Sequence, residues 1–155
     1  MYFWLKSFHL LGMILFLGNI VVTACWKLQA DKSRNPTVIA FGCRLVIFTD
    51  WIFTLPGAIL LAASGYANAG MMGRSLVGEH WLLGGQLLFF ATGIIWMAVL
   101  IPTQRKQSAL AREFGEGQTI PEAYWRLASR WKIFGYLTIA LAVIALFLMV
   151  FKPAF

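Results

Sequence analysis

The amino-acid sequence predicts an all-α integral membrane protein, a four-helix bundle whose helices cross the bilayer up-down-up-down. The first observation is composition, since 60% of the 155 residues are hydrophobic and only 12% are charged. A soluble domain has roughly 25% charged residues. The second is the mean hydropathy of +0.74. The third is that polar connectors separate four apolar stretches, each long enough for a span of about 20 residues.

The chain is expected to form one transmembrane domain over residues 1–155, with no separate soluble domain. We expect spans at about residues 2–26, 37–64, 80–101 and 131–151, and a cytoplasmic amphipathic segment at 103–130. Pro102 should end or kink the third span, because proline lacks a backbone donor. Thr119 and Glu122 form a capping-box pattern, which predicts that the last helix begins at Ile120 and runs on through the fourth span.

The basic residues predict the orientation. Ten of the 13 Lys and Arg residues lie at 27–44 and 102–132, and three lie on the other side. The positive-inside rule therefore places these two segments in the cytoplasm and both termini on the outer, periplasmic side of a bacterial inner membrane. The net charge of +7 follows from this topology, so we expect the lipid bilayer as a partner and no nucleic acid.

The two histidines are the candidate metal ligands. His9 lies on the inward face of the first span and His80 opens the third, both at the outer end. Neutral imidazole binds haem iron and copper. Lys6 and Arg74 lie at the same end and could meet the propionates of a haem. The alternatives are that His9 bonds a neighbouring helix and that His80 is an interfacial residue. Three methionines are rival axial ligands: Met13, Met71 and Met72.

Asp50 is the most informative polar residue. It lies about 20 Å along the second span, which predicts a position near the midplane. An acid at that depth is paired, protonated or part of a proton path. Asn19 and Thr54 are its expected partners, and Gln86 is expected to bond another helix. These four residues form either a proton relay or a structural polar core.

Several motifs extend along the chain. The first span opens with Y-x-W-L-K-x-x-H, from Tyr2 to His9, and later stretches read F-x-G-N at Phe16–Asn19, T-D-W at Thr49–Trp51, F-T-x-P-G at Phe53–Gly57 and L-I-P-x-Q at Leu100–Gln104. Together they resemble a family of uncharacterised, predicted four-span bacterial integral membrane proteins. The opening pattern alone also resembles the HemJ-type protoporphyrinogen oxidases and is similar to the membrane part of CopD-like copper-resistance proteins.

The resemblance to HemJ-type proteins implies a four-span haem-b protein of redox type. It implies oxidoreductase as the class of enzyme, with His9 as haem ligand and Lys6 beside it. Two other functions stay open. One is a cofactor-free structural or partner-binding membrane subunit, whose partner is another membrane protein or a second copy of this chain. The other is a copper or proton conduit, which would use Asp50 and the Met and His residues. No nucleophile–base pair or phosphate-binding loop supports a hydrolase or a nucleotide-binding protein.

Overall fold

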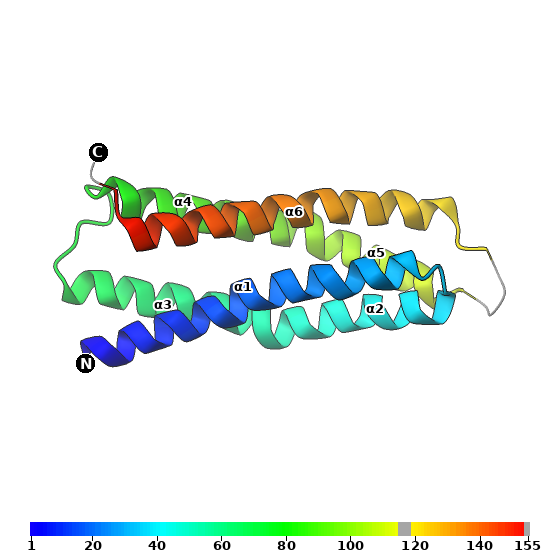
Figure 1. The fold of residues 1–155 in the computed structure, drawn as a ribbon, viewed down its shortest axis with the longest axis horizontal. Helices are drawn as coiled ribbons and strands as arrows, with labels where there is room; N and C mark the ends of the chain where they lie inside the picture. The colour runs from blue at the N-terminus through cyan, green and yellow to red at the C-terminus, as the bar shows by residue number, and fades with distance from the viewer. Residues whose placement is uncertain (115–118, 154–155) are drawn as a thin grey trace.

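Four long helical rods form the protein in the computed structural model, which describes residues 1–114 and 119–153. They pack antiparallel, up-down-up-down, with both termini at one end (Figure 1). The all-α membrane bundle is confirmed, and the described residues contain no strand. The rods comprise α1 (Tyr2–Lys32); α2 (Pro36–Thr49), the π-helix η1 (Asp50–Thr54) and α3 (Leu55–Met71); α4 (His80–Ile95), the π-helix η2 (Trp96–Leu100) and α5 (Ile101–Arg112); and α6 (Glu122–Phe151).

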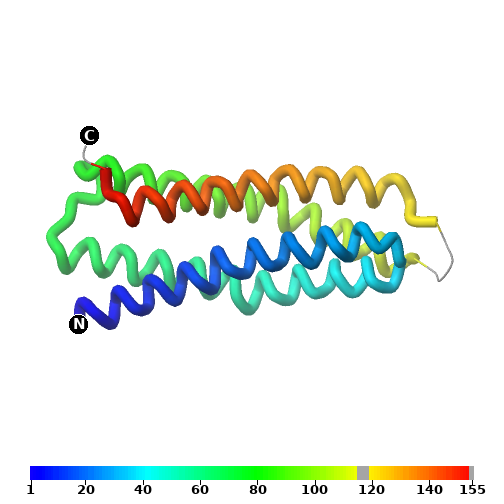
Figure 2. The backbone as a smooth tube through the Cα atoms, in the orientation of Figure 1, coloured from blue at the N-terminus to red at the C-terminus, as the bar shows by residue number. Residues whose placement is uncertain are grey.

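Each rod is longer than a bilayer requires. The rods have 31, 36, 33 and 30 residues, and all four are apolar enough to cross a membrane. At about 1.5 Å per residue they measure about 45–54 Å, whereas the hydrocarbon core is about 30 Å thick. Figure 2 shows the end of the bundle opposite the termini, where α5 ends. Arg105, Lys106 and Arg112 of α5 are exposed. We call this end of the bundle the basic end.

Two expected helix boundaries are wrong. Pro102 does not end the third rod, because η2 precedes it and α5 continues to Arg112. The capping box at Thr119 does not form either: α6 begins at Glu122, with Pro121 as its N-cap and no side-chain capping bond. Proline disfavours the helical conformation at the residue before it. This explains why Ile120, which precedes Pro121, lies outside the helix.

The outer surface of the rods carries large apolar side chains, as a lipid-facing surface requires. Exposed examples from the four rods are Ile14, Phe48, Leu87 and Ile144. In water such a surface would be an unusually large apolar patch. In the bilayer, lipid tails cover it and the polar side chains are left for the interior of the bundle.

The backbones of α1 and α3 touch at two glycines. A Cβ atom at Gly12 would lie 2.5 Å from the backbone nitrogen of Leu61, and one at Gly57 would lie 2.7 Å from that of Phe16. Small residues allow such close approach between membrane helices. The contact seals the half of the α1–α3 interface that lies toward the termini.

Gly12→Ala is therefore expected to destabilise the protein by about 1–3 kcal/mol, the usual effect of overpacking. Gly18→Ala on the same helix is the matched control, because no atom lies within 4 Å of a Cβ there. Unfolding in detergent, followed by circular dichroism, should show the loss for Gly12→Ala and none for Gly18→Ala. Equal stability of the two variants would contradict the close α1–α3 contact.

Candidate functional site

A buried carboxylate joins three rods at the centre of the candidate site. Asp50, the first residue of η1, is 5% exposed. Its Oδ1 accepts from the Thr54 hydroxyl at 2.9 Å and from the Asn19 amide at 3.4 Å. Its Oδ2 accepts from the Gln104 amide at 3.0 Å and the Trp96 indole at 3.1 Å. We call these five side chains the Asp50 network.

The donors supply as many hydrogen bonds as a carboxylate can accept. An ionised carboxylate has about four lone-pair positions, and each oxygen of Asp50 receives two donors. The Asn19 amide also donates to the Thr54 hydroxyl at 2.8 Å, which fixes the orientation of both side chains. This arrangement therefore suits the ionised form of Asp50, because it offers the carboxylate only donors.

The two π-helices bring the network together. In η1 the amide of Leu55 donates to the Asp50 carbonyl, and in η2 the amide of Ile101 donates to the Trp96 carbonyl. Each π-helix ends two residues before a proline, Pro56 or Pro102. Proline cannot donate to the preceding turn, and the wider turn accommodates that loss without ending the helix. Asp50 and Trp96 each occupy the first position of their π-helix.

Asp50 lies in the half of the second rod nearer the basic end. It is the fifteenth of the 36 residues from Pro36 to Met71, about 21 Å from the start of that rod at about 1.5 Å per residue. Its expected position near the midplane of the bilayer stays a prediction.

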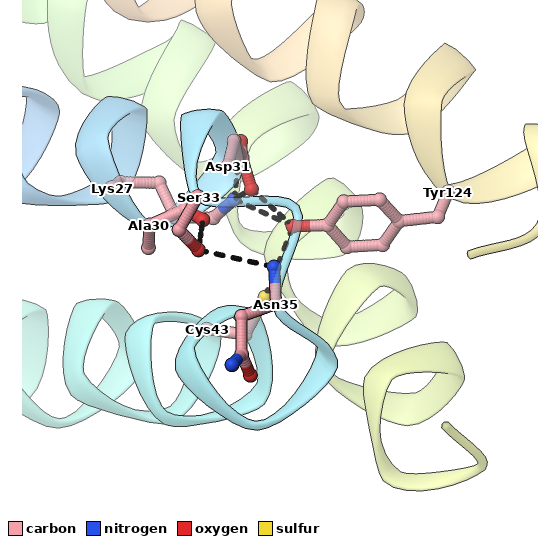
Figure 3. Close-up of polar contacts among 7 residues, drawn as sticks. All are labelled: Lys27, Ala30, Asp31, Ser33, Asn35, Cys43 and Tyr124. Atoms are coloured by element: carbon pink, nitrogen blue, oxygen red, sulfur yellow. Dashed lines mark hydrogen bonds and ion pairs between the residues drawn. The ribbon is translucent and has the colours of Figure 1, made fainter. Parts of the chain in front are cut away.

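A second polar cluster lies at the basic end and joins α1 to α6 (Figure 3). The ammonium of Lys27 is 1% exposed and lies 2.7 Å from both carboxylate oxygens of Asp31. It also donates to the Tyr124 hydroxyl at 2.8 Å, and that hydroxyl donates to Asp31 at 2.5 Å. The Cys43 sulfur lies 3.6 Å from the same hydroxyl. We call Lys27, Asp31, Tyr124 and Cys43 the Lys27 cluster.

The structure does not bring the two histidines together. His9 is half-buried on α1, where its Nδ1 bonds the Leu61 carbonyl of α3 at 2.9 Å and its ring packs on Gly65. His80 is exposed at the start of α4, and no residues of α1 and α4 have Cα atoms within 8 Å of each other. The described residues contain no group of three or more His, Cys, Asp or Glu side chains placed to hold a metal ion.

The remaining predicted site residues lie at the end that carries the termini. Lys6 is exposed on α1. Arg74 pairs with Glu79 at 2.8 Å and lies over the Trp81 ring. The expected bond from Gln86 to another helix is wrong, since its amide donates to the Leu76 carbonyl of the α3–α4 connector and to its own helix. Gln86 is thus no part of the Asp50 network.

Asn19 and Thr54 lie against Asp50, as the sequence predicts. The other two partners of Asp50, Trp96 and Gln104, were not predicted, and neither was the Lys27 cluster. Gln104 was missed because the third span was expected to stop at Ile101, with Pro102 ending or kinking it. Lys27 was counted only as a topology marker. The available signal was the four-residue spacing of Asn19, Thr23, Lys27 and Asp31, which marks one polar face of a helix.

The fold and the polar interior together define a multi-pass integral membrane protein whose apolar exterior encloses a buried carboxylate. The model of the family of predicted integral membrane proteins (DUF2269) matches residues 3–153, and the chain belongs to this family. This confirms the resemblance to a four-span membrane family, while the links to HemJ-type and CopD-like proteins stay predictions. No curated protein and no solved structure matches the chain.

Lys27→Met is expected to destabilise the protein by about 3 kcal/mol, because it leaves the carboxylate of Asp31 without its cation. Adding Asp31→Asn should recover part of that loss, since the stranded charge is then removed. Arg126→Met is the control: its ion pair with Glu122 is solvent-exposed and should contribute little. Unfolding in detergent of wild type, Lys27→Met, Asp31→Asn and the double variant measures the coupling, and strict additivity at Lys27 and Asp31 would contradict a buried ion pair.

Proposed function

We propose that this protein binds and releases a proton at Asp50 and thereby acts as a proton conduit of a bacterial inner membrane. The observation that carries the proposal is the Asp50 network: a buried carboxylate whose hydrogen-bonding partners come from three rods. Ionisable groups inside membrane bundles are rare, and they mark proton and ion paths.

The environment of Asp50 holds its two protonation states in competition. The apolar surroundings favour the neutral acid, whereas the four donors favour the carboxylate. Lys27 is the charged side chain on the network's face of α1, two turns away, while Arg105 and Lys106 of α5 and Arg130 and Lys132 of α6 are exposed. The balance at Asp50 is therefore set mainly by burial and by its hydrogen bonds.

Protonation of Asp50 would require the network to rearrange. A carboxylic acid carries a donor of its own and needs an acceptor, and the Trp96 indole has none to offer. Gln104 can provide one if its amide turns over, so that its carbonyl faces Asp50. Each such change involves η1, η2 or the start of α5, and π-helical turns are frequent at functional sites. Proton binding would thus be coupled to the packing of the second and third rods.

The proposal includes an orientation. The basic end would face the cytoplasm, because ten of the 13 Lys and Arg residues lie in the segments at that end or on their flanks. Asp50 is nearer to this end than to the end with the termini. The proton would therefore enter or leave Asp50 on the cytoplasmic side in the conformation described above.

Asp50→Asn should abolish proton uptake by proteoliposomes. The vesicles would contain the pH-sensitive dye pyranine and a potassium gradient, and valinomycin would start the flux. Asparagine keeps the size of the side chain but cannot exchange a proton. Thr92→Val is the control, since Thr92 is 2% exposed and its hydroxyl bonds only Leu88 of its own helix. Uptake by Asp50→Asn at the wild-type rate would overturn the proposal and favour a structural or partner-binding subunit.

A haem-binding redox protein is the second candidate function, and one feature of His9 favours it. Its Nδ1 bonds the Leu61 carbonyl, which leaves Nε2 as the ligand nitrogen. Metal-binding histidines commonly have their other ring nitrogen held in this way. The candidate second ligand His80 is exposed, so a haem at His9 would need a different second ligand or an open position.

The haem candidate is tested by a reduced-minus-oxidised spectrum of protein purified from cells supplied with haem. If haem b is bound at His9, a Soret band should be present in wild type and absent in His9→Ala. His80→Ala is the comparison, and it should leave the spectrum unchanged, because His80 does not lie near His9. A wild-type protein without a Soret band, or a His9→Ala variant that keeps it, would contradict haem binding at His9.

A further inference from the structure

Three buried polar side chains between the Asp50 network and the Lys27 cluster have no hydrogen-bond partner. Thr23, Gln107 and Trp131 are 3%, 1% and 5% exposed. The unpartnered atoms are the hydroxyl oxygen of Thr23, both the nitrogen and the oxygen of the Gln107 amide, and the indole nitrogen of Trp131. Buried polar groups are almost always paired, so an accumulation of this kind calls for a partner.

The helical register places Thr23 and Gln107 in one layer. On α1, Thr23 lies one turn after Asn19 of the Asp50 network and one turn before Lys27. On α5, Gln107 lies one turn after Gln104 of the same network and one turn before Ala111. Ala111 packs in the cluster of buried residues that contains Tyr124 and Cys43. Both side chains thus lie between the two polar sites.

Trp131 of α6 belongs to the same layer. Its ring lies 5.7 Å from the Lys27 ammonium, and it packs with Leu100, the last residue of η2. Trp96 of the Asp50 network packs against the same cluster of buried residues. Three rods therefore bring buried, unpartnered polar atoms, both donors and acceptors, to the layer between Lys27 and Asp50.

We propose that this layer holds a short file of bound water that connects the Lys27 cluster to Asp50. Water satisfies buried polar groups of mixed donor and acceptor character, as it does in most proteins. Lys27 follows Asn19 by eight residues, which is about 12 Å along the helix, and three or four waters at normal hydrogen-bonding distances can bridge that length. The occupancy of the layer by water is independent of the proposed function, whereas its use as a proton route rests on that function.

The file reaches solvent at the basic end. Asp31, in contact with Lys27, is 14% exposed and gives the path a point of access to solvent. Toward the termini, α1 and α3 touch at Gly12 and Gly57, which leaves no room for a side-chain atom between these two helices. The file thus leads from the aqueous face at the basic end to Asp50.

Deuterium exchange at the indole nitrogen of Trp131 tests the water file directly, by NMR of detergent-solubilised protein labelled with ¹⁵N-tryptophan. Gln107→Leu removes two of the unpartnered atoms, and Thr23→Val is a second, nearly isosteric variant that covers the case in which Gln107→Leu does not fold. Wild type should exchange at least about tenfold faster than either variant. Thr92→Val, in which the lost hydroxyl was already bonded, should exchange like wild type. Equal rates in wild type and both layer variants would overturn the water file.

Proton uptake by proteoliposomes of the same variants tests the route. Gln107→Leu and Thr23→Val should slow uptake at least about fivefold, while Thr92→Val should not. Slower exchange at Trp131 with unchanged uptake would overturn the layer's role as the proton route. If Asp50→Asn takes up protons like wild type while Trp131 still exchanges rapidly, the proposed function fails and the water file stands.

Discussion

The carboxylate of Asp50 is the constraint on which the interior of this bundle depends. Placing a charge in an apolar layer is unfavourable unless donors surround it, and the donors here come from α1, η1, η2 and α5. Each of these segments must hold its side chain within about 3 Å of one residue, which fixes their relative rotation and height. Apolar packing between membrane helices sets neither so strictly, because lipid tails are as apolar as the side chains.

The sequence predicts the fold because the bilayer leaves few alternatives. Backbone groups in hydrocarbon must be bonded within the chain, so four apolar stretches imply four helices. The same reasoning identifies Asp50 and its neighbours Asn19 and Thr54, since polar residues in an apolar stretch need one another. It fails at Gln104, because Pro102 was expected to end or kink the third span near that point, and η2 instead allows the helix to continue. A local rule on proline was overridden by a wider helical turn, which residue spacing does not reveal.

Lys27 shows a second reason why the sequence is insufficient. Basic residues at the end of a span usually mark the cytoplasmic boundary and remain exposed. The side chain of Lys27 instead points into the bundle, because the rods continue beyond the hydrocarbon and need an interior of their own there. Its ammonium is paired with Asp31 and lies over the rings of Tyr124 and Trp131. Helix length beyond the bilayer, and not charge alone, determines whether such a residue is buried.

The inward face of α1 is apolar toward the termini and polar toward the basic end. Toward the termini that face carries Gly12 and Phe16, whose backbones touch the backbone of α3 and leave no room for a side chain between the two helices. Toward the basic end the same face carries Asn19, Thr23 and Lys27, one turn apart. The proposed proton exchange at Asp50 would therefore follow the polar half of this face, toward the basic end, because the other half is occupied by the backbone contact with α3.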